Sequence, residues 1–341
     1  MKPPCAVRLP SHEAGAFISR ALSLDILDKG IRILREEPYV IVPLKRAPNQ
    51  LEFRGFNYTT IAPDALRWLE RGKPLQKIRR RLQLPQHLNA HLPLKWEFLG
   101  DALIFKLHST LRELEWEIAS TYAEVLGATS VYTVEGCIEG AYRKPRLRLV
   151  YGPGGEVKHQ EHGTIFVLDP AQVMFSSANH DERMRMTTVC TPGERVVDMF
   201  AGIGHLSMPL SVHSSPSVVY ACEPDPLTYS YLVKTVEANR QERRFCLING
   251  RNELLSVSDC DRVIMGYLED TREYLQHALS MVRIRGTVHF HELVERGKGA
   301  QWKREIMEST SPFSVTVSEI KRVKGFNGRM DHMVMDIVRL S

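Results

Sequence analysis

The chain has 341 residues and a formal net charge of +5, a length that allows two or three domains, each with its own core. The composition is typical of a soluble protein, and no apolar stretch approaches the roughly 20 residues needed to span a bilayer, so a membrane-spanning helix is excluded. The first residues also lack the long apolar segment of a secretory signal.

The six cysteines are scattered without a C-x-x-C pair. This spacing favours a reducing compartment, here predicted to be the cytoplasm, and argues against structural zinc or a disulfide framework. Basic residues gather in three blocks, 73–81, 143–148 and 321–324. A solvated surface explains any single block, whereas three together favour a polyanionic partner, because phosphate contacts give affinity independent of sequence. The charges alone do not separate RNA from DNA.

Residues 1–72 are predicted to form a small N-terminal α/β domain. Strand patterns occur at 7–10 and 39–43, and a helix pattern at 13–23. Residues 73–93 are polar, basic and interrupted by prolines, which is typical of a linker.

Residues 94–190 are predicted to form a second α+β domain followed by a connector. A strand begins near Trp96 and continues at 103–105, and 111–126 has the pattern of an amphipathic helix. Further strands are expected at 131–134, 146–151 and 164–168, the last two separated by Gly152-Pro153-Gly154-Gly155.

From residue 191 to residue 341, strand and helix patterns alternate. A helix over 226–239 starts with proline at the favoured first position. Two β-rich runs, 313–323 and 331–338, are expected to close a parallel sheet as an antiparallel pair. The parallel strands are expected at 195–200, 218–223, 245–248, 262–265 and 287–291. The pattern predicts an α/β fold with a class I methyltransferase-type (Rossmann-like) domain at the C-terminus, after two smaller α+β domains.

The stretch 197–204 (VDMFAGIG) predicts a strand, a glycine turn and the start of a helix. Gly202 and Gly204 have no Cβ to obstruct a ligand lying against the backbone. The next strand ends in Glu223, whose carboxylate can hold both ribose hydroxyls of a nucleoside. Ser207 replaces the third glycine of a dinucleotide motif, so S-adenosylmethionine fits better. A tight turn without a ligand is the alternative for the glycines alone.

With these motifs in place, the chain resembles the tRNA-modifying enzymes that act on the guanosine next to the anticodon, and within them the wybutosine-synthesizing protein 2 group. Guanine-N1 methyltransferases of this family carry Asn-Leu-Pro or Asn-Pro-Pro where this chain has Met265-Gly266-Tyr267, and Pro-Arg in the connector where it has Ser177-Ala178-Asn179. Both departures match the wybutosine group. The resemblance covers nearly the whole chain, through segments 7–43, 96–101, 174–183, 221–226, 265–267 and 289–292, and Val323, Lys324, His332 and Asp336.

The resemblance implies transfer of the 3-amino-3-carboxypropyl group of S-adenosylmethionine to carbon 7 of 4-demethylwyosine at position 37 of tRNA-Phe, with release of methylthioadenosine. It implies tRNA-Phe as the partner, with residues 1–72 as a tRNA-binding domain, and no membrane, metal or obligate protein partner. The nearest alternative is a tRNA (guanine-37-N1)-methyltransferase. A non-catalytic tRNA-binding paralogue and a DNA or small-molecule methyltransferase are further alternatives.

Several residues are expected to form the cofactor site. Asp198 either orders the glycine turn or touches the ligand, and Asn252 is a candidate for the adenine edge. Met265, Gly266 and Tyr267 are expected to set the placement of the methionine moiety, with the Tyr267 ring stacking on the base. The full predicted set of cofactor-binding residues is Asp198, Phe200, Gly202, Gly204, Glu223, Asn252, Met265 and Gly266.

The catalytic residues are expected to be Tyr267, His289 and His291. The two histidines alternate on a strand, so both lie on one face, and either is a candidate base for the carbon-bound proton. A polar strand end near the cofactor is the alternative. The resemblance further implies that RNA is contacted by Ser176, Asn179, Arg183, Lys324 and His332, with a structural salt bridge as the alternative for Arg183.

Overall fold

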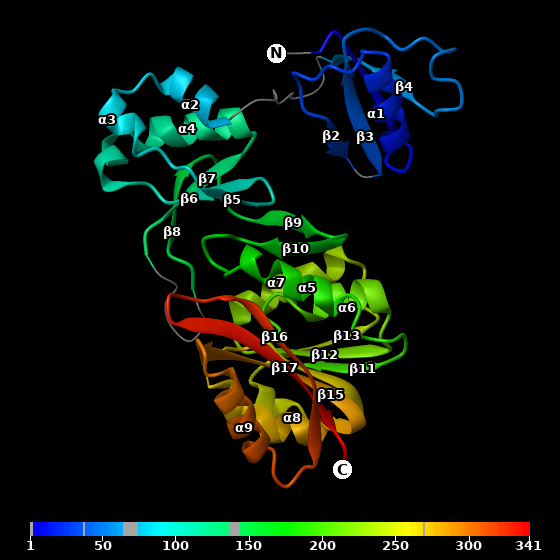
Figure 1. Ribbon diagram of the computed structural model, residues 1–341, viewed down its shortest axis with the longest axis vertical. Coiled ribbons are helices and arrows are strands. Elements are labelled where there is room, and N and C mark those ends of the chain that lie inside the picture. Colours follow the sequence, from blue (N-terminus) through cyan, green and yellow to red (C-terminus); the bar gives the residue numbers. More distant parts are fainter. Residues whose placement is uncertain (1–2, 37, 64–73, 137–143, 269) are drawn as a thin grey trace. The chain divides into compact units, whose positions relative to one another are not determined.

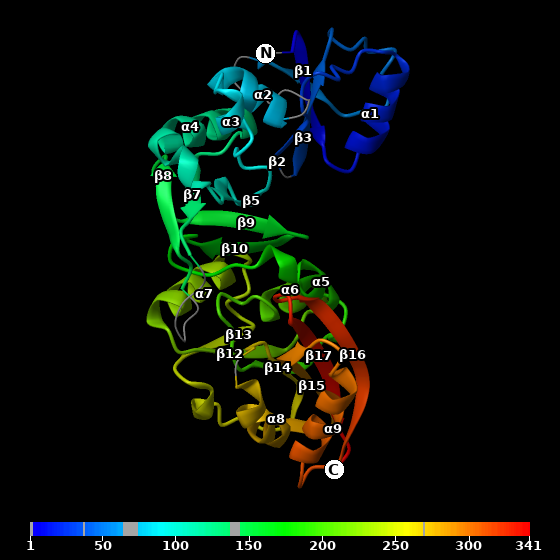
Figure 2. The same cartoon turned by 60° about the vertical axis from the view of Figure 1, so that its left-hand side comes forward.

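The structure is a computed structural model that describes residues 3–36, 38–63, 74–136, 144–268 and 270–341. The chain separates into two compact units (Figure 1, Figure 2). One unit is made of Met1–Glu97, Leu103–Thr133 and Val150–Pro153. The other is made of Phe98–Ala102, Val134–Leu149 and Gly154–Ser341, and it contains the glycine turn.

The N-terminal part of the first unit is a four-stranded antiparallel sheet with one helix. Its strands lie in the spatial order β2-β3-β1-β4. Phe17 of the helix is fully buried, and its ring centroid lies 4.4 Å from that of Phe53, so the helix covers an apolar face of the sheet. The predicted helix and strands are confirmed. The elements are β1 (Cys5–Pro10), α1 (Ala14–Ser23), β2 (Leu34–Glu36), β3 (Tyr39–Leu44) and β4 (Thr59–Ile61).

A second sheet of four strands has the order β5-β6-β7-β8. The helix α4 (Glu115–Leu126) directly follows a 3-10 helix at Ser109–Leu114, and the two together match the helix predicted over 111–126. Tyr122 of α4 is fully buried and donates a hydrogen bond to the Pro93 carbonyl at 2.7 Å. The other elements are α2 (Pro74–Leu82), α3 (Gln86–Asn89), β5 (Trp96–Leu99), β6 (Ala102–Phe105), β7 (Ser130–Val134) and β8 (Leu147–Tyr151).

The prediction of a linker at 73–93 is wrong for its described part. α2 packs against α4 and buries Ile78 and Leu82. On its solvent side, Arg81 forms an ion pair with Glu124 of α4 at 2.7 Å. The basic block is therefore the exposed face of an amphipathic helix, whose short apolar stripe is easily overlooked in a polar sequence.

A seven-stranded sheet dominates the second unit, in the order β13-β12-β11-β14-β15-β17-β16. The first five strands in this spatial order pair in parallel, whereas β17 is antiparallel to both β15 and β16. This confirms the predicted class I methyltransferase-type fold and its closing antiparallel pair. The strands are β11 (Arg195–Asp198), β12 (Val218–Glu223), β13 (Phe245–Asn249), β14 (Cys260–Met265), β15 (Val282–Glu295), β16 (Val315–Gly325) and β17 (Met330–Arg339).

Helices cover both faces of this sheet (Figure 1, Figure 2). On one face lie α8 (Leu275–Met281) and α9 (Gly299–Ser309), which bury an apolar core that includes Phe290 and Trp302. On the other lie α5 (His180–Met186), α6 (Ser207–Ser214) and α7 (Pro226–Ala238). The Asp225 side chain caps α7 by accepting from the Thr228 N–H at 3.0 Å, as expected before a helix that opens with proline.

The hairpin of β9 (Val157–Glu161) and β10 (Thr164–Leu168) belongs to the second unit. β10 packs on α7, where Asn239 Oδ1 accepts the Ile165 N–H at 2.9 Å and Thr235 Oγ1 accepts the Val167 N–H at 3.0 Å. The predicted boundary near residue 190 is therefore corrected, because the hairpin and α5 group with the catalytic sheet from Gly154 onward.

Candidate cofactor and acceptor site

The glycine turn follows β11 and has the geometry that the sequence predicts. Gly202 has φ +57° and Gly204 has φ +87°, a region that residues with a Cβ seldom adopt. A Cβ on Gly202 would lie only 2.7 Å from Cδ2 of His205. The left-handed backbone and the close approach of His205 therefore both require glycine at 202, in a turn at the carboxyl end of a central parallel strand where ligands of such sheets bind.

Glu223 ends β12, next to the turn. Its Oε2 accepts the Gly202 N–H at 3.0 Å and its Oε1 accepts the Asp225 N–H at 2.9 Å. Each carboxylate oxygen keeps a second lone pair, so ribose hydroxyls can still donate to it. The side chain is mostly buried, and burial raises its pKa to about 7. Glu223 thus both fixes the turn and presents a carboxylate beside it.

Asp198 orders the turn. It is 1% exposed, and its Oδ1 accepts the Phe200 N–H at 3.3 Å. Burial raises its pKa to about 6. Of the two alternatives for this residue, the structure therefore favours the turn-ordering role over direct contact with a ligand.

Asn252 stands at the start of a 3-10 helix, Asn252–Leu254, just after β13. Its side chain is 5% exposed, and Oδ1 has no hydrogen-bond partner among the residues that the structure describes. An unsatisfied buried acceptor costs free energy unless a ligand donates to it. The amine of an adenine ring is a donor of the required kind, so this atom fits a bound adenosyl group.

Met265, Gly266 and Tyr267 follow β14, but they do not share one environment. The Met265 side chain is fully buried in the core beneath α8, which corrects the prediction that it shapes the cofactor site. Tyr267 is half-buried and stacks on Phe200, with ring centroids 5.3 Å apart and planes 20° apart. Tyr274 meets Phe200 edge-on at 5.4 Å. These three rings form an aromatic platform beside the glycine turn.

Phe175–Asn179, here called the acceptor segment, carries two of the predicted RNA contacts and lies against the β16–β17 hairpin. Lys324 of β16 donates from Nζ to Ser176 Oγ at 2.7 Å. Asn179 Oδ1 is buried and without a hydrogen-bond partner in the described part of the chain. The structure therefore brings together Ser176, Asn179 and Lys324, three of the five residues predicted to contact RNA.

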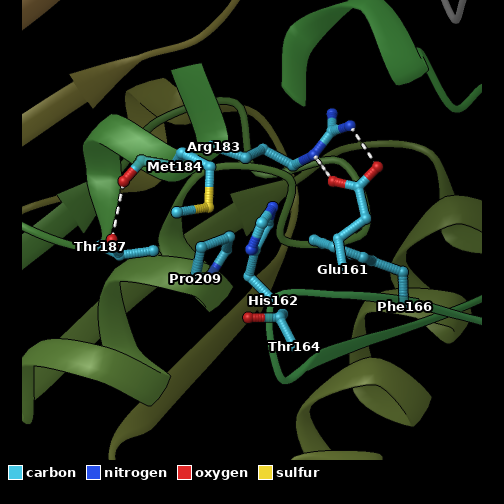
Figure 3. Close-up of a pocket in the computed structure, with 8 residues that line it drawn as sticks. All are labelled: Glu161, His162, Thr164, Phe166, Arg183, Met184, Thr187 and Pro209. Atoms are coloured by element: carbon cyan, nitrogen blue, oxygen red, sulfur yellow. Dashed lines mark hydrogen bonds and ion pairs between the residues drawn. The ribbon is translucent and has the colours of Figure 1, made fainter. Parts of the chain in front are cut away.

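Arg183 is a structural residue in this arrangement. The Arg183 side chain is 3% exposed, and its guanidinium donates to both carboxylate oxygens of Glu161 at 2.6 and 2.8 Å. This ion pair lines a small pocket between the β9–β10 hairpin and α5 (Figure 3). The guanidinium also donates to the Ser176 carbonyl at 2.9 Å and lies 4.5 Å from the Phe175 ring centroid. The RNA-contact prediction is thus corrected, and the salt-bridge alternative for this residue is confirmed.

His289 cannot act as the predicted base. Its Nε2 lies 2.7 Å from Arg262 Nη1, and its Nδ1 lies 2.7 Å from Asp336 Oδ1. Because a guanidinium only donates, Nε2 must accept, and the ring proton on Nδ1 points to Asp336. Burial lowers the pKa of His289 further. The lone pair of Nε2 already accepts from Arg262, so the alternative, a polar strand end near the cofactor, holds for His289.

His291 and His332 form a second buried pair, with Nδ1 of the first 2.9 Å from Nε2 of the second. His291 is fully buried and His332 is 3% exposed. Burial and the nearby Arg185 charge lower the pKa of His291 to about 3. One nitrogen of each imidazole has an internal partner, and Nε2 of His291 lies 3.5 Å from Oε1 of Glu182. Proton transfer by His291 and phosphate contact by His332 stay predictions.

The sequence patterns missed the buried ion-pair network that holds α5 on the sheet. Arg185 donates to Glu182 at 2.7 Å within α5 and to Asp336 of β17 at 2.6 Å. Although burial opposes it, the hydrogen bond from His289 and the charge and hydrogen bond of Arg185 lower the pKa of Asp336 to about 2. A pair of charges 151 residues apart carries no local sequence signal, although Glu182 and Asp336 both belong to segments of the family resemblance.

Among the residues that the structure describes, no group of three or more histidine, cysteine, aspartate or glutamate side chains is arranged to hold a metal ion. Among the same residues, no helix is both long enough and apolar enough to cross a membrane.

Comparison with known proteins identifies the family. A model described as the TRM5/TYW2 methyltransferase domain matches residues 157–317, and one described as the TYW2 N-terminal domain matches residues 78–155. A tRNA(Phe) (4-demethylwyosine(37)-C(7)) aminocarboxypropyltransferase of Pyrococcus horikoshii is 37% identical over 262 residues, 75% of this chain and 92% of that protein. The chain belongs to the TYW2 family.

Solved structures agree with this assignment. The crystal structure of P. horikoshii TYW2 in complex with MeSAdo superposes with a TM-score of 0.71 at 33% identity, covering 78% of this chain and 99% of that one. Trm5b of Pyrococcus abyssi, whose curated name is tRNA (guanine(37)-N(1))-methyltransferase, superposes over 99% of both chains with a TM-score of 0.68 at 27% identity. The TYW2 family and its Trm5 relatives therefore share this fold.

Proposed function

We propose that this protein is a transferase that moves the 3-amino-3-carboxypropyl group of S-adenosylmethionine to carbon 7 of 4-demethylwyosine at position 37 of tRNA-Phe, releasing methylthioadenosine. The observation that carries this proposal is the segment Met265-Gly266-Tyr267, which replaces the Asn-Pro-Pro type of triplet and puts an aromatic ring beside the glycine turn. The name of the P. horikoshii relative supports the same reaction.

Three groups of this chain are suited to hold the cofactor. The glycine turn lets the ligand lie against the backbone, and Glu223 accepts from its ribose hydroxyls. Asn252 Oδ1, buried and without a hydrogen-bond partner among the described residues, accepts from the adenine amine. The complexes of relatives with AdoMet and with MeSAdo support this choice of cofactor.

The bound sulfonium supplies three carbons, each open to attack in line with sulfur. Which one reacts depends on which one faces the base, because holding the reacting atoms about 3–3.5 Å apart in the right orientation supplies much of the rate. The Phe200–Tyr267 platform provides a surface on which a tricyclic base stacks. Ser176, Asn179 and Lys324 border the acceptor side and are the groups suited to hold the nucleotide.

The proposed tRNA partner also matches features outside the catalytic sheet. In the N-terminal sheet, a groove of about 480 Å³ lies between α1 and the segment that carries Arg32 and Arg35. Two guanidinium groups beside an open groove suit RNA phosphates. Exposed Arg79, Arg80 and Arg81 on α2 add positive charge. The cytoplasmic location and the absence of an obligate protein partner stay predictions.

Mass spectrometry of the position-37 nucleoside tests the reaction. Purified protein is incubated with S-adenosylmethionine and tRNA-Phe carrying either 4-demethylwyosine or guanosine. The proposal expects the first substrate to gain an aminocarboxypropyl group and the second to stay unchanged. A methyl group gained by guanosine would instead establish the methyltransferase alternative, and the variant Glu223→Ala serves as a control that lacks the ribose contact.

A further inference from the structure

His205 is the side chain that touches both halves of the site. It follows Gly204 on the glycine turn, and the ring edge carrying Cδ2 and Nε2 faces Gly202. On its other side, the ring lies 5.6 Å from Phe175 of the acceptor segment, between centroids. His205 therefore stands where the cofactor turn meets the acceptor segment.

In its neutral form, the His205 ring carries a proton on one nitrogen and a lone pair on the other. The lone pair of His289, by contrast, accepts from Arg262.

The surroundings of His205 keep its ring neutral. Burial and the charge of Arg183 are the main causes that lower its pKa to about 3, with Lys324 acting in the same direction and Glu161 opposing them. The lone pair is therefore available throughout the physiological pH range. Lys324 and Arg183 both contact Ser176, so the acceptor segment and His205 share one electrostatic environment.

The proposed reaction needs an acceptor for one proton. When carbon 7 attacks the methylene carbon of the methionine moiety, a carbon–carbon bond forms, the carbon–sulfur bond breaks, and methylthioadenosine leaves with that electron pair. Carbon 7 then carries both its hydrogen and the new substituent, and the base bears the positive charge. Loss of the proton returns the carbon–hydrogen electron pair to the ring. Because such a cation is a strong acid, a weak base is sufficient to accept its proton.

We propose that His205 is the proton acceptor for carbon 7, taking the proton on the unprotonated nitrogen of its neutral ring and passing it to water. This inference rests on the proposed function. It assigns a chemical role to a residue for which the sequence patterns predict none.

The test compares His205→Phe, which keeps the aromatic packing, with His205→Gln, a polar replacement without a basic nitrogen, and with His213→Phe, an exposed histidine on α6, as the matched control. Each protein is assayed with acceptor tRNA carrying hydrogen or deuterium at carbon 7, at saturating cofactor. Calorimetry with S-adenosylmethionine and far-UV circular dichroism accompany the rates.

We expect both His205 variants to lose about 10²–10⁴-fold in kcat, as removal of a general base does. They should also acquire a deuterium isotope effect that the wild type and His213→Phe lack, because proton removal becomes rate-limiting, while cofactor affinity stays unchanged. A folded His205 variant with full activity would overturn the inference. So would a loss explained by weaker cofactor binding, or a slower reaction without an isotope effect. If the wild type itself transfers no aminocarboxypropyl group, the proposed function fails first.

Discussion

The buried network around Arg185 gives the most quantitative prediction for stability. Its guanidinium is 8% exposed and lies between Glu182, 1% exposed, and Asp336, 9% exposed. These contacts attach α5, and with it the acceptor segment, to the catalytic sheet. Replacing Arg185 by methionine preserves much of the volume but leaves two carboxylates buried without their cation.

Removing one partner of a buried, hydrogen-bonded ion pair costs about 3–5 kcal/mol, since the remaining charge is neither solvated nor compensated. We therefore expect Arg185→Met to lower the free energy of unfolding of the second unit by about that amount. Urea denaturation of the full chain, followed by far-UV circular dichroism, measures this as a lower midpoint. The triple variant with Glu182→Gln and Asp336→Asn should recover much of the loss, because no uncompensated charge remains.

Arg283→Met is the matched control. Arg283 also forms an ion pair, with Asp261 at 2.6 Å, but its side chain is 48% exposed. Water can solvate the Asp261 carboxylate that remains, so Arg283→Met should lower the free energy of unfolding by less than about 1 kcal/mol. If Arg185→Met destabilised the protein no more than Arg283→Met, the network would not hold α5 in place and the reasoning would be refuted.

Three further predictions concern the cofactor turn and its platform. The pKa of Glu223 is about 7, so its carboxyl gains a proton as the pH falls below that value. The dissociation constant of S-adenosylmethionine, measured by calorimetry, should therefore rise roughly tenfold per pH unit below 7. Glu223→Gln should abolish this pH dependence. Gly202→Ala should lower the free energy of unfolding by about 1–2 kcal/mol, because alanine would adopt a left-handed φ and its Cβ would contact His205. The variant should also bind the cofactor more weakly, and an unchanged melting temperature would contradict this prediction. Tyr267→Phe should keep the transfer rate, whereas Tyr267→Ala should reduce it without changing cofactor affinity, and equal rates for all three proteins would exclude the stacking role.

The fold was largely predictable because its strands are short apolar runs separated by clear turn residues. The exceptions have physical reasons. β9 (Val157–Glu161) reads as Val-Lys-His-Gln-Glu, and its polar residues conceal a strand that is specified by pairing with β10. α2 buries Ile78 and Leu82, so its basic surface dominates the sequence and resembles a linker.

The cofactor side of the site was predictable because its signals are local. Gly202, Gly204 and Glu223 lie within one strand–turn–helix–strand unit, and the structure joins the Gly202 N–H to the Glu223 carboxylate. The roles of buried charged residues were not predictable in this way. Asp336 lies 47 residues from His289, and Glu161 lies 22 residues from Arg183, so only the folded chain reveals that these partners satisfy one another.

One measurement tests the central claim most directly. S-adenosylmethionine labelled with one isotope on the methyl group and another on the carboxyl carbon is incubated with the protein and with tRNA-Phe bearing 4-demethylwyosine, and the label in the recovered tRNA is counted. The account predicts that the carboxyl label enters the tRNA while the methyl label leaves in methylthioadenosine. Methyl label in the tRNA, with the carboxyl label released in the nucleoside product, would contradict it.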